Sequence, residues 1–160
     1  MAIEYFLKLD GIQGESLAAK HQNEIELHSW SWGSTSPRDM ATNMSAGKVE
    51  VHLLNIQKPT DKSSPKLLGY CCSLKNIATG VLTCCKSTGD SNPADFMTIK
   101  LTNVVVSSFQ TGGSHHDETG AESVSLAFQK VEFDYKIQGK DGTLTAAGTA
   151  TYDLTTRTSS

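Results

Sequence analysis

The residues best suited to metal binding or acid–base chemistry are His115, His116 and Asp117, with Glu118 beside them. Imidazole and carboxylate groups bind transition metals and act as general bases, so a metal-dependent hydrolase is one hypothesis. However, the group lies between glycine-rich segments, and adjacent histidines lack the spacing by which a helix or strand aligns a ligand pair. The pattern therefore favours a solvated loop, and it leaves the role of His115 and His116 open.

Four cysteines form two adjacent pairs, Cys71-Cys72 and Cys84-Cys85. Neither pair has the two-residue gap of a zinc knuckle or a redox motif. Neighbouring side chains point in different directions on a helix and to opposite faces on a strand, so one pair cannot readily hold one ion. We expect reduced, mostly buried thiols, whose further role the sequence does not fix.

Other chemical motifs are incomplete. Gly11 and Gly14 follow a predicted strand, but no third glycine and no helix complete a dinucleotide-binding fingerprint. The sequence has no Gly-x-Ser-x-Gly nucleophile elbow and no pair of carboxylates in a predicted cleft. Trp30 and Trp32 could stack on a sugar or base, although aromatic residues on a strand more often serve packing or subunit contact. We predict no enzyme activity and no catalytic, metal or cofactor residues.

Length and charge limit the remaining classes. A chain of 160 residues suits a single domain, which we place at 1–160. The 14 Lys and Arg residues against 17 Asp and Glu, without a basic cluster, argue against nucleic-acid binding. The sequence has no apolar run of about 18 residues for membrane insertion. Residues 1–10 alternate in polarity instead of forming a signal peptide, so we expect synthesis and assembly in the cytoplasm.

Hydrophobic periodicity predicts the elements that position these residues. Polar and apolar residues alternate through most of the chain, which predicts a mainly β fold. One helix is expected at about 62–75, because Asp61 and Ser63 precede Pro65 and an apolar stripe follows. The predicted strands are 3–9, 24–32, 49–53, 77–86, 95–110, 122–137 and 144–154, with turn-forming residues at 87–93.

Two predicted strands change their apolar face partway. In 24–32 the apolar side passes from Ile25 and Leu27 to the tryptophans, which predicts two different environments. In 122–137 the apolar positions change from even to odd near Gln129 and Lys130, as a β-bulge or a change of buried face produces. Bulges let a long strand bend around a small barrel.

Two segments carry no clear period. Residues 33–48 form a long loop, for which we keep two interpretations: a mobile surface loop, or an arm that packs on a neighbouring subunit. Residues 155–160 are expected to be a loose polar tail.

The order of several short segments resembles the haemolysin-coregulated protein (Hcp) family, the tube proteins of type VI secretion systems. The similarity extends over nearly the whole chain, which makes it more specific than any single motif. Cys84-Cys85 and His115-His116 depart from the family pattern. The matching segments are 9–16 (LDGIQGES), 24–33 (EIELHSWSWG), 46–49 (AGKV), 61–67 (DKSSPKL), 104–108 (VVVSS), 111–114 (TGGS), 122–126 (ESVSL) and 131–135 (VEFDY).

The resemblance implies a single β-barrel of two packed antiparallel sheets with one flanking α-helix. It implies self-association into homohexameric rings that stack into a tube, propelled by a contractile sheath and exported with a spike protein. Effector proteins would be carried and stabilised in the lumen. The alternative from another class is a small-molecule-binding soluble β-barrel, which needs an apolar cavity inside one subunit.

The resemblance also implies roles for particular residues. The Trp-Ser-Trp strand of relatives borders the lumen, so Ser31 is the candidate lumen-facing residue, and Trp30 and Trp32 are candidates for an interface strand. Candidates for inter-subunit contact come from the long loop: Ser36, Pro37, Arg38, Asp39, Met40 and Met44.

Overall fold

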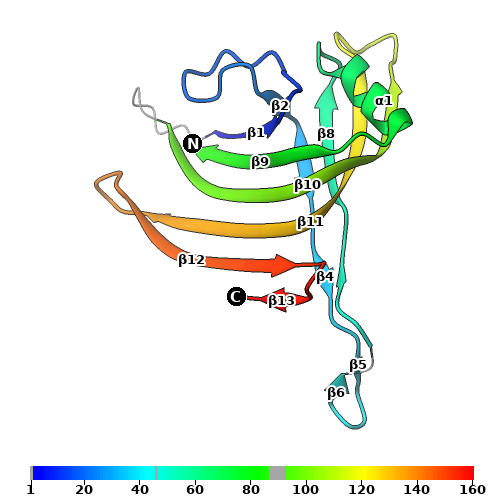
Figure 1. The fold of residues 1–160 in the computed structure, drawn as a ribbon. Coiled ribbons are helices and arrows are strands. Elements are labelled where there is room, and N and C mark those ends of the chain that lie inside the picture. The colour runs from blue at the N-terminus through cyan, green and yellow to red at the C-terminus, as the bar shows by residue number, and fades with distance from the viewer. Residues whose placement is uncertain (1, 46, 87–92) are drawn as a thin grey trace.

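A computed structural model describes residues 2–45, 47–86 and 93–160 of the chain (Figure 1). Most of these residues lie in strands, and one short helix interrupts them, which confirms the predicted mainly β class. The turn-rich segment predicted at 87–93 lies almost wholly outside the described residues. In chain order the elements are β1 (Ile3–Leu9), β2 (Ile25–Leu27), β3 (Ser29–Ser31), β4 (Ser34–Thr35), β5 (Arg38–Asp39), β6 (Met44–Ser45), β7 (Glu50–Val51), β8 (Leu54–Pro59), α1 (Ser64–Ser73), β9 (Ile77–Lys86), β10 (Ala94–Gly112), β11 (Ala121–Gln138), β12 (Leu144–Asp153) and β13 (Thr158–Ser159).

The main sheet is antiparallel and strongly curved (Figure 1). Its strand order is β2-β1-β9-β10-β11-β12-β13, and β8 and β3 branch from β11. The branch arises because β11 is long: its first part pairs with β8, as in Leu126 opposite Leu54, and its later part pairs with β12, as in Lys130 opposite Asp153. One half of the sheet thus encloses a core, while β12 and β13 extend beyond it.

The segment predicted as the strand 24–32 connects the two edges of the half of the sheet that encloses the core. It is divided into β2, which pairs with β1, and β3, which pairs with β8, with only His28 between them. The backbone N–H of His28 donates to the carbonyl of Gln57 at 2.7 Å. The predicted change of environment is confirmed. The fold resembles a barrel, but the paired strands do not form an uninterrupted ring, so the predicted single β-barrel describes it only loosely.

The predicted face change in β11 has a counterpart in β10. Along β11 the buried positions pass from Phe128 to Val131, and along β10 they pass from Leu101 to Val104. Between the latter pair, Asn103 adopts a left-handed conformation with φ of 54°, and its side-chain amide donates to Gln129 Oε1 at 2.8 Å. Both strands therefore turn their apolar side to the core together, which keeps their pairing in register.

The strand predicted at 49–53 is misplaced. Only Glu50–Val51 of that range is paired, in β7, and the strand that covers the core is β8. Its inward positions are Leu54, Ile56 and Lys58, all fully buried. The alternation of Val49, Val51 and Leu53 predicted the earlier segment, but Leu53 is 40% exposed. The lysine at the third inward position hid the pattern of β8.

Helix α1 lies within the predicted range and packs beside β10 at one end of the sheet (Figure 1). Pro65 occupies its first turn, and Leu74, with φ of 55°, ends it. Leu67 is fully buried, whereas Leu68 is 49% exposed, so the apolar stripe is narrower than predicted. No helix among the residues that the structure describes is long and apolar enough to cross a lipid bilayer.

The C-terminal residues are not a loose tail. In β13, Ser159 pairs with Tyr152 and Thr158 with Asp153 of β12. The backbones of Ser160 and Thr151 exchange two hydrogen bonds of 2.9 and 2.8 Å. This hairpin extends the sheet by one short strand.

Candidate interaction surfaces

The segment predicted as a long loop is an arm of paired strands. Its base pairs β4 with β7, and its distal part pairs β5 with β6, placing Arg38 opposite Ser45 and Asp39 opposite Met44. Figure 1 shows the β5–β6 hairpin well away from the body of the molecule. The segment is therefore an arm, and its packing on a neighbouring subunit stays a prediction.

Local hydrogen bonds shape the tip of the arm. The carbonyl of Asp39 accepts from the backbone N–H of Asn43 at 2.7 Å, and the Asp39 carboxylate accepts from the N–H of Ala41 at 2.9 Å. Asn43 supplies the left-handed position of the turn, with φ of 54°. The tip nevertheless presents Met40 at 93% and Met44 at 68% exposure. Apolar side chains held in solvent on a hairpin are suited to contact with another protein.

The candidate inter-subunit residues all lie in this arm. The structure places all but Pro37, which is partly buried, in solvent. Their contact with a neighbouring subunit stays a prediction. They are Ser36, Pro37, Arg38, Asp39, Met40 and Met44.

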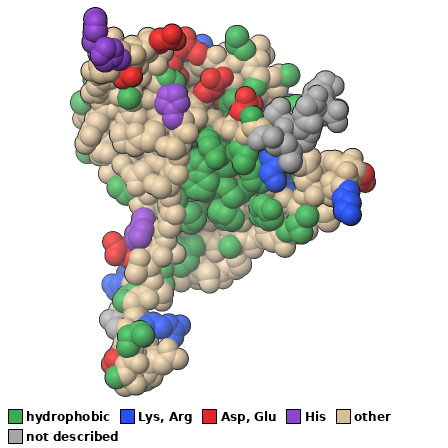
Figure 2. Space-filling view, turned by 180° about the vertical axis from the view of Figure 1, so that it is seen from behind, with side chains coloured by type: hydrophobic (Ala, Val, Ile, Leu, Met, Phe, Trp, Pro, Cys, Tyr) green, Lys and Arg blue, Asp and Glu red, His purple; other side chains and the backbone are tan. Residues whose placement is uncertain are grey.

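An apolar groove, here called the arm groove, lies between the base of the arm and the extended half of the sheet. It has a volume of about 310 Å³. Figure 2 shows hydrophobic side chains gathered on one face of the molecule. Val49 on the rim is 47% exposed, and Phe133 is partly buried. The apolar residues that line the groove are Trp32, Val49, Val51, Val131, Phe133, Ala150 and Tyr152.

The two tryptophans contribute first to their own subunit. Both are partly buried and pack against the core. Trp30 meets Tyr5 edge-on, with ring centroids 6.4 Å apart, and the indole N–H of Trp32 donates to the carbonyl of His52 at 2.9 Å. Trp32 also lines the arm groove. A role for either tryptophan in an interface stays a prediction.

Ser31 is exposed on β3. It pairs with Asn55 of β8, whose side-chain oxygen accepts from Ser125 Oγ at 2.6 Å. Nearby, Gln57 Nε2 donates to Ser123 Oγ at 3.0 Å. Their neighbours along β8 and β11 include the core residues Leu54, Ile56 and Val124, so the polar side chains face away from the core. We call Ser29, Ser31, Asn55, Gln57, Ser123 and Ser125 the polar strip.

Among the described residues, the loop histidines His115 and His116 belong to no group of potential metal ligands. His115 and His116 are exposed, with ring centroids 5.5 Å apart. The three-ligand group found in the described part of the chain consists instead of His21, Cys85 and Asp95. No local sequence pattern indicates this group, because its members are distant along the chain.

A second feature that sequence reasoning missed is an ion pair inside the fold. Lys58 is fully buried, and its ammonium lies 2.6 Å from Glu122 and 3.1 Å from Asp61. Ser64 Oγ and Thr111 Oγ1 also donate to Glu122, at 2.6 and 2.9 Å. These contacts tie β8, the start of α1, β10 and β11 together.

The pKa of Glu122 reflects this setting. Burial opposes ionisation, but hydrogen bonds from Lys58, Ser64 and Thr111, together with the charge of Lys58, outweigh it and hold the pKa below its usual value. The group is therefore ionised at neutral pH. Since Lys58 is inaccessible to solvent, this arrangement stabilises the fold and is unsuited to act on a substrate.

The cysteines match the expectation only in part. Cys84 and Cys85 are buried on opposite faces of β9, whereas Cys71 is partly buried and Cys72 exposed. All four are free thiols. Burial raises the pKa of Cys84 to about 11 and, with the nearby Asp95 carboxylate, that of Cys85 to about 12. These two thiols are thus protonated at neutral pH.

Comparison with known proteins gives a consistent result. Residues 6–135 match the family model described as type VI secretion system effector, Hcp. The chain is 38% identical over 144 residues to protein hcp1 of Pseudomonas aeruginosa, covering 89% of this chain and 88% of that protein. Over the full length of both chains it resembles the crystal structure of Hcp1 from Salmonella typhimurium, with a TM-score of 0.82 and 34% identity. A structure described as a type six secretion system protein is similar with a TM-score of 0.91 and 28% identity, over 99% of this chain and 100% of that one.

Proposed function

Because this chain belongs to the Hcp family of type VI secretion proteins, we propose that it is a structural subunit of the secretion tube. In this proposal the single domain 1–160 assembles into hexameric rings in the cytoplasm, the rings stack, and the tube is exported with the spike when the sheath contracts. The role is structural and not catalytic, in keeping with the family.

The observation that carries the proposal is the arm groove beside the projecting arm. A ring needs a heterologous interface, in which one surface of each subunit meets a different surface of the next. The arm ends in the exposed Met40 and Met44, and the groove offers partly exposed Val49 and Phe133. Apolar groups on two separate surfaces of one chain supply the two halves of such an interface.

The polar strip suits a wet lumen. It presents hydroxyl and amide groups and includes Ser31, the candidate lumen residue. Neutral polar groups hold water well and form hydrogen bonds with many partners, so such a surface can accept different cargo proteins without tight packing. We propose that effector proteins bind against this strip.

The arm groove does not support the alternative of a small-molecule-binding barrel. Such a protein encloses its ligand in an apolar cavity within one subunit. The arm groove instead lies at the surface, with the exposed Val49 on its rim. An open apolar surface of this kind favours contact with another protein.

Measurement of the absolute mass tests the assembly. We expect light scattering after size exclusion to give the mass of a hexamer, and negative-stain images of the same peak to show rings. A monomer at every concentration, without rings, contradicts the proposal.

Lumen binding has a separate test. Ser31→Lys should leave the rings intact and reduce co-purification of an effector encoded with the same secretion system. The reason is that each subunit of the ring would add one ammonium group to the surface of the lumen. Lys100 is already exposed on β10, so Lys100→Ser serves as a control for a change of charge elsewhere. Undiminished effector binding by Ser31→Lys would rule out the lumen assignment.

A further inference from the structure

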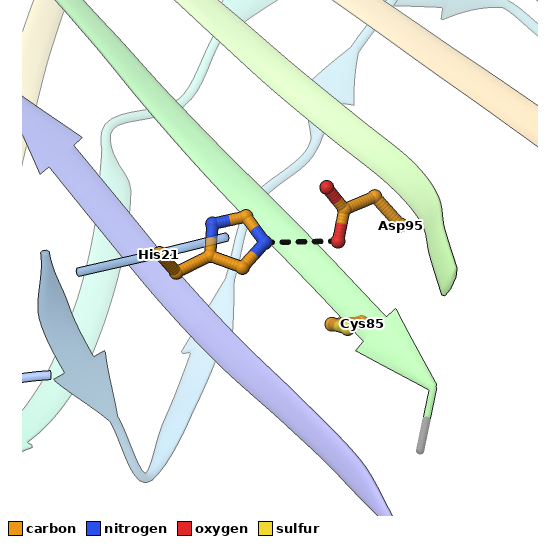
Figure 3. A group of neighbouring side chains, drawn as sticks. All are labelled: His21, Cys85 and Asp95. Atoms are coloured by element: carbon orange, nitrogen blue, oxygen red, sulfur yellow. Dashed lines mark hydrogen bonds and ion pairs between the residues drawn. The ribbon is translucent and has the colours of Figure 1, made fainter. Parts of the chain in front are cut away.

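Three potential metal ligands from distant parts of the chain meet beneath the β1–β2 loop. His21 lies in that loop, Cys85 near the end of β9, and Asp95 near the start of β10 (Figure 3). Cys85 and Asp95 are directly opposite in the β9–β10 pairing. A nitrogen of His21, the sulfur of Cys85 and a carboxylate oxygen of Asp95 all lie within 4.8 Å of one another.

Hydrogen bonds within the loop that carries His21 fix its shape. The backbone N–H of Gly14 donates to the carbonyl of Asn23 at 2.8 Å, and Asn23 N–H donates to the carbonyl of Ser16 at 2.8 Å. The His21 ring stacks on Phe6 with centroids 4.6 Å apart. The loop thereby covers the face of β9 that points away from the core, which is why Cys85 is only 1% exposed.

A bulge on β10 adds to the convergence. The pairing of β9 with β10 shifts by one residue between Asp95 and Met97, directly after the acidic residue. Bulges occur beside functional sites because they redirect a side chain relative to its neighbours. Here the bulge lies next to the residue that completes the group.

The His21 ring has an orienting partner on its other side. Its Nε2 is 2.9 Å from Asp95 Oδ1, while its Nδ1 is hydrogen-bonded to the carboxylate of Glu24. In metal sites, a histidine ligand usually donates its second ring N–H to such a carboxylate, which fixes the tautomer and makes the ligating nitrogen more basic. Glu24 is 9% exposed and well placed for that role.

We propose that His21 Nε2, Cys85 Sγ and the Asp95 carboxylate form a binding site for Zn²⁺, with Glu24 as the positioning residue for His21. Nitrogen, thiolate and carboxylate are the ligands that Zn²⁺ prefers, and three protein ligands leave a fourth position for water. Binding forms a Zn–S bond and releases the thiol proton of Cys85 to solvent, so two negative ligands balance the charge of the ion.

The distance between the nitrogen and oxygen ligands allows the ion with a small adjustment. Zinc bonds of about 2.0–2.3 Å in a tetrahedron place the ligand atoms about 3.3–3.6 Å apart. The separation of His21 Nε2 and Asp95 Oδ1, 2.9 Å, would have to widen by about 0.4 Å by this geometry. Asp95 can make that movement, because its side chain is 33% exposed while that of His21 is 8% exposed. The same exposure gives an ion a route in.

Cobalt provides a direct test, because a Co²⁺–thiolate bond gives a near-ultraviolet charge-transfer band that a hydrogen-bonded network cannot produce. Purified full-length protein, stripped with a chelator and kept reduced, would be titrated with Co²⁺. We expect the band to saturate at one ion per chain and to disappear when Zn²⁺ is added. Absence of the band in the wild-type protein would show that the cluster is a hydrogen-bonded network only.

Matched thiol variants identify the ligand. Cys85→Ser should abolish the band, whereas Cys84→Ser, on the opposite face of the same strand, and Cys72→Ser, at the surface, should retain it. A band that persists in Cys85→Ser would overturn the site. Glu24→Gln should keep the band and weaken Co²⁺ binding by about 10- to 100-fold, because it changes only the hydrogen-bond partner of the ligand His21.

A second measurement separates loss of metal binding from loss of folding. Zn²⁺ should raise the melting temperature of the wild-type and Cys84→Ser proteins, but not that of Cys85→Ser. Circular dichroism of each variant without metal shows whether it has folded. The site lies within one chain, so its failure would leave the tube proposal unaffected.

Discussion

The ammonium of Lys58 lies 2.6 Å from the carboxylate of Glu122, although 64 residues separate them in the chain. Lys58 is fully buried, and Glu122 is only 2% exposed. The pair joins β8 to the part of β11 that forms the barrel-like half of the sheet. The two charges can be buried only because they form an ion pair and nearby hydroxyl groups form hydrogen bonds with them.

Removing one member of this pair should destabilise the protein strongly. Lys58→Met leaves the Glu122 carboxylate buried without its cation, and we expect a loss of about 3–5 kcal/mol in the free energy of unfolding. Urea denaturation at one fixed protein concentration measures it. Lys58→Met/Glu122→Leu should lose less than the two single variants together, and the exposed Lys100→Met should change little. Equal losses for Lys58→Met and Lys100→Met would contradict the assignment.

Stability should fall in acid because of Glu122. Its pKa is lower in the folded protein than in the unfolded chain, so the contribution to stability is fully present above the unfolded value of about 4.5. It is lost as the pH falls from there through the lowered folded pKa. Urea midpoints between neutral and acid pH measure the effect. Glu122→Gln should be less stable at neutral pH and show a shallower acid dependence; parallel curves for both proteins would exclude this explanation.

Gly14 should not tolerate a side chain. A Cβ there would lie 2.4 Å from the backbone oxygen of Glu24 and 2.6 Å from Ile25 Cα. We expect Gly14→Ala to cost about 1–3 kcal/mol, measured by urea denaturation, because backbone atoms must move. The control is Gly69→Ala in α1, where a Cβ meets nothing within 4 Å. That change should stabilise by about 0.5–1 kcal/mol, since alanine is the better helix former. A harmless Gly14→Ala would refute the close approach.

A charge in the arm groove should prevent assembly without unfolding the subunit. Val49 is 47% exposed on the rim, so a monomer should tolerate Val49→Asp. In the assembled ring, the same change would place a carboxylate in the apolar contact between subunits. We expect light scattering to show a shift from rings to monomers, with unchanged circular dichroism. Leu17→Asp, at an 86% exposed position outside the groove, should still form rings. Intact rings from Val49→Asp would place the interface elsewhere.

Much of the fold could be predicted because it depends on neighbouring residues. Alternation placed β1, β10, β11 and β12 within a few residues, since side chains of a strand point alternately to its two faces. Proline and the preceding polar residues placed the start of α1. The face change near Gln129 was also visible, because a shift of one residue moves every later side chain to the other side.

The arm shows where local reasoning stops. Polar residues, proline and glycine indicated a loop at 33–48, yet the chain there forms two short paired segments. Strands of two residues are too short to show alternation, and their pairing depends on where the chain returns. The same applies to β13, which the polar composition of 155–160 concealed.

The sequence alone determined the mainly β class, the helix and the family, because these follow from local periodicity and from the order of short segments. Only the tertiary structure decided which polar groups are buried together. Lys58 and Glu122, like His21 and Asp95, are ordinary residues until strands distant in the chain align them and remove water around them. Burial is a property of the assembled sheet, so no pattern within one segment could reveal either group.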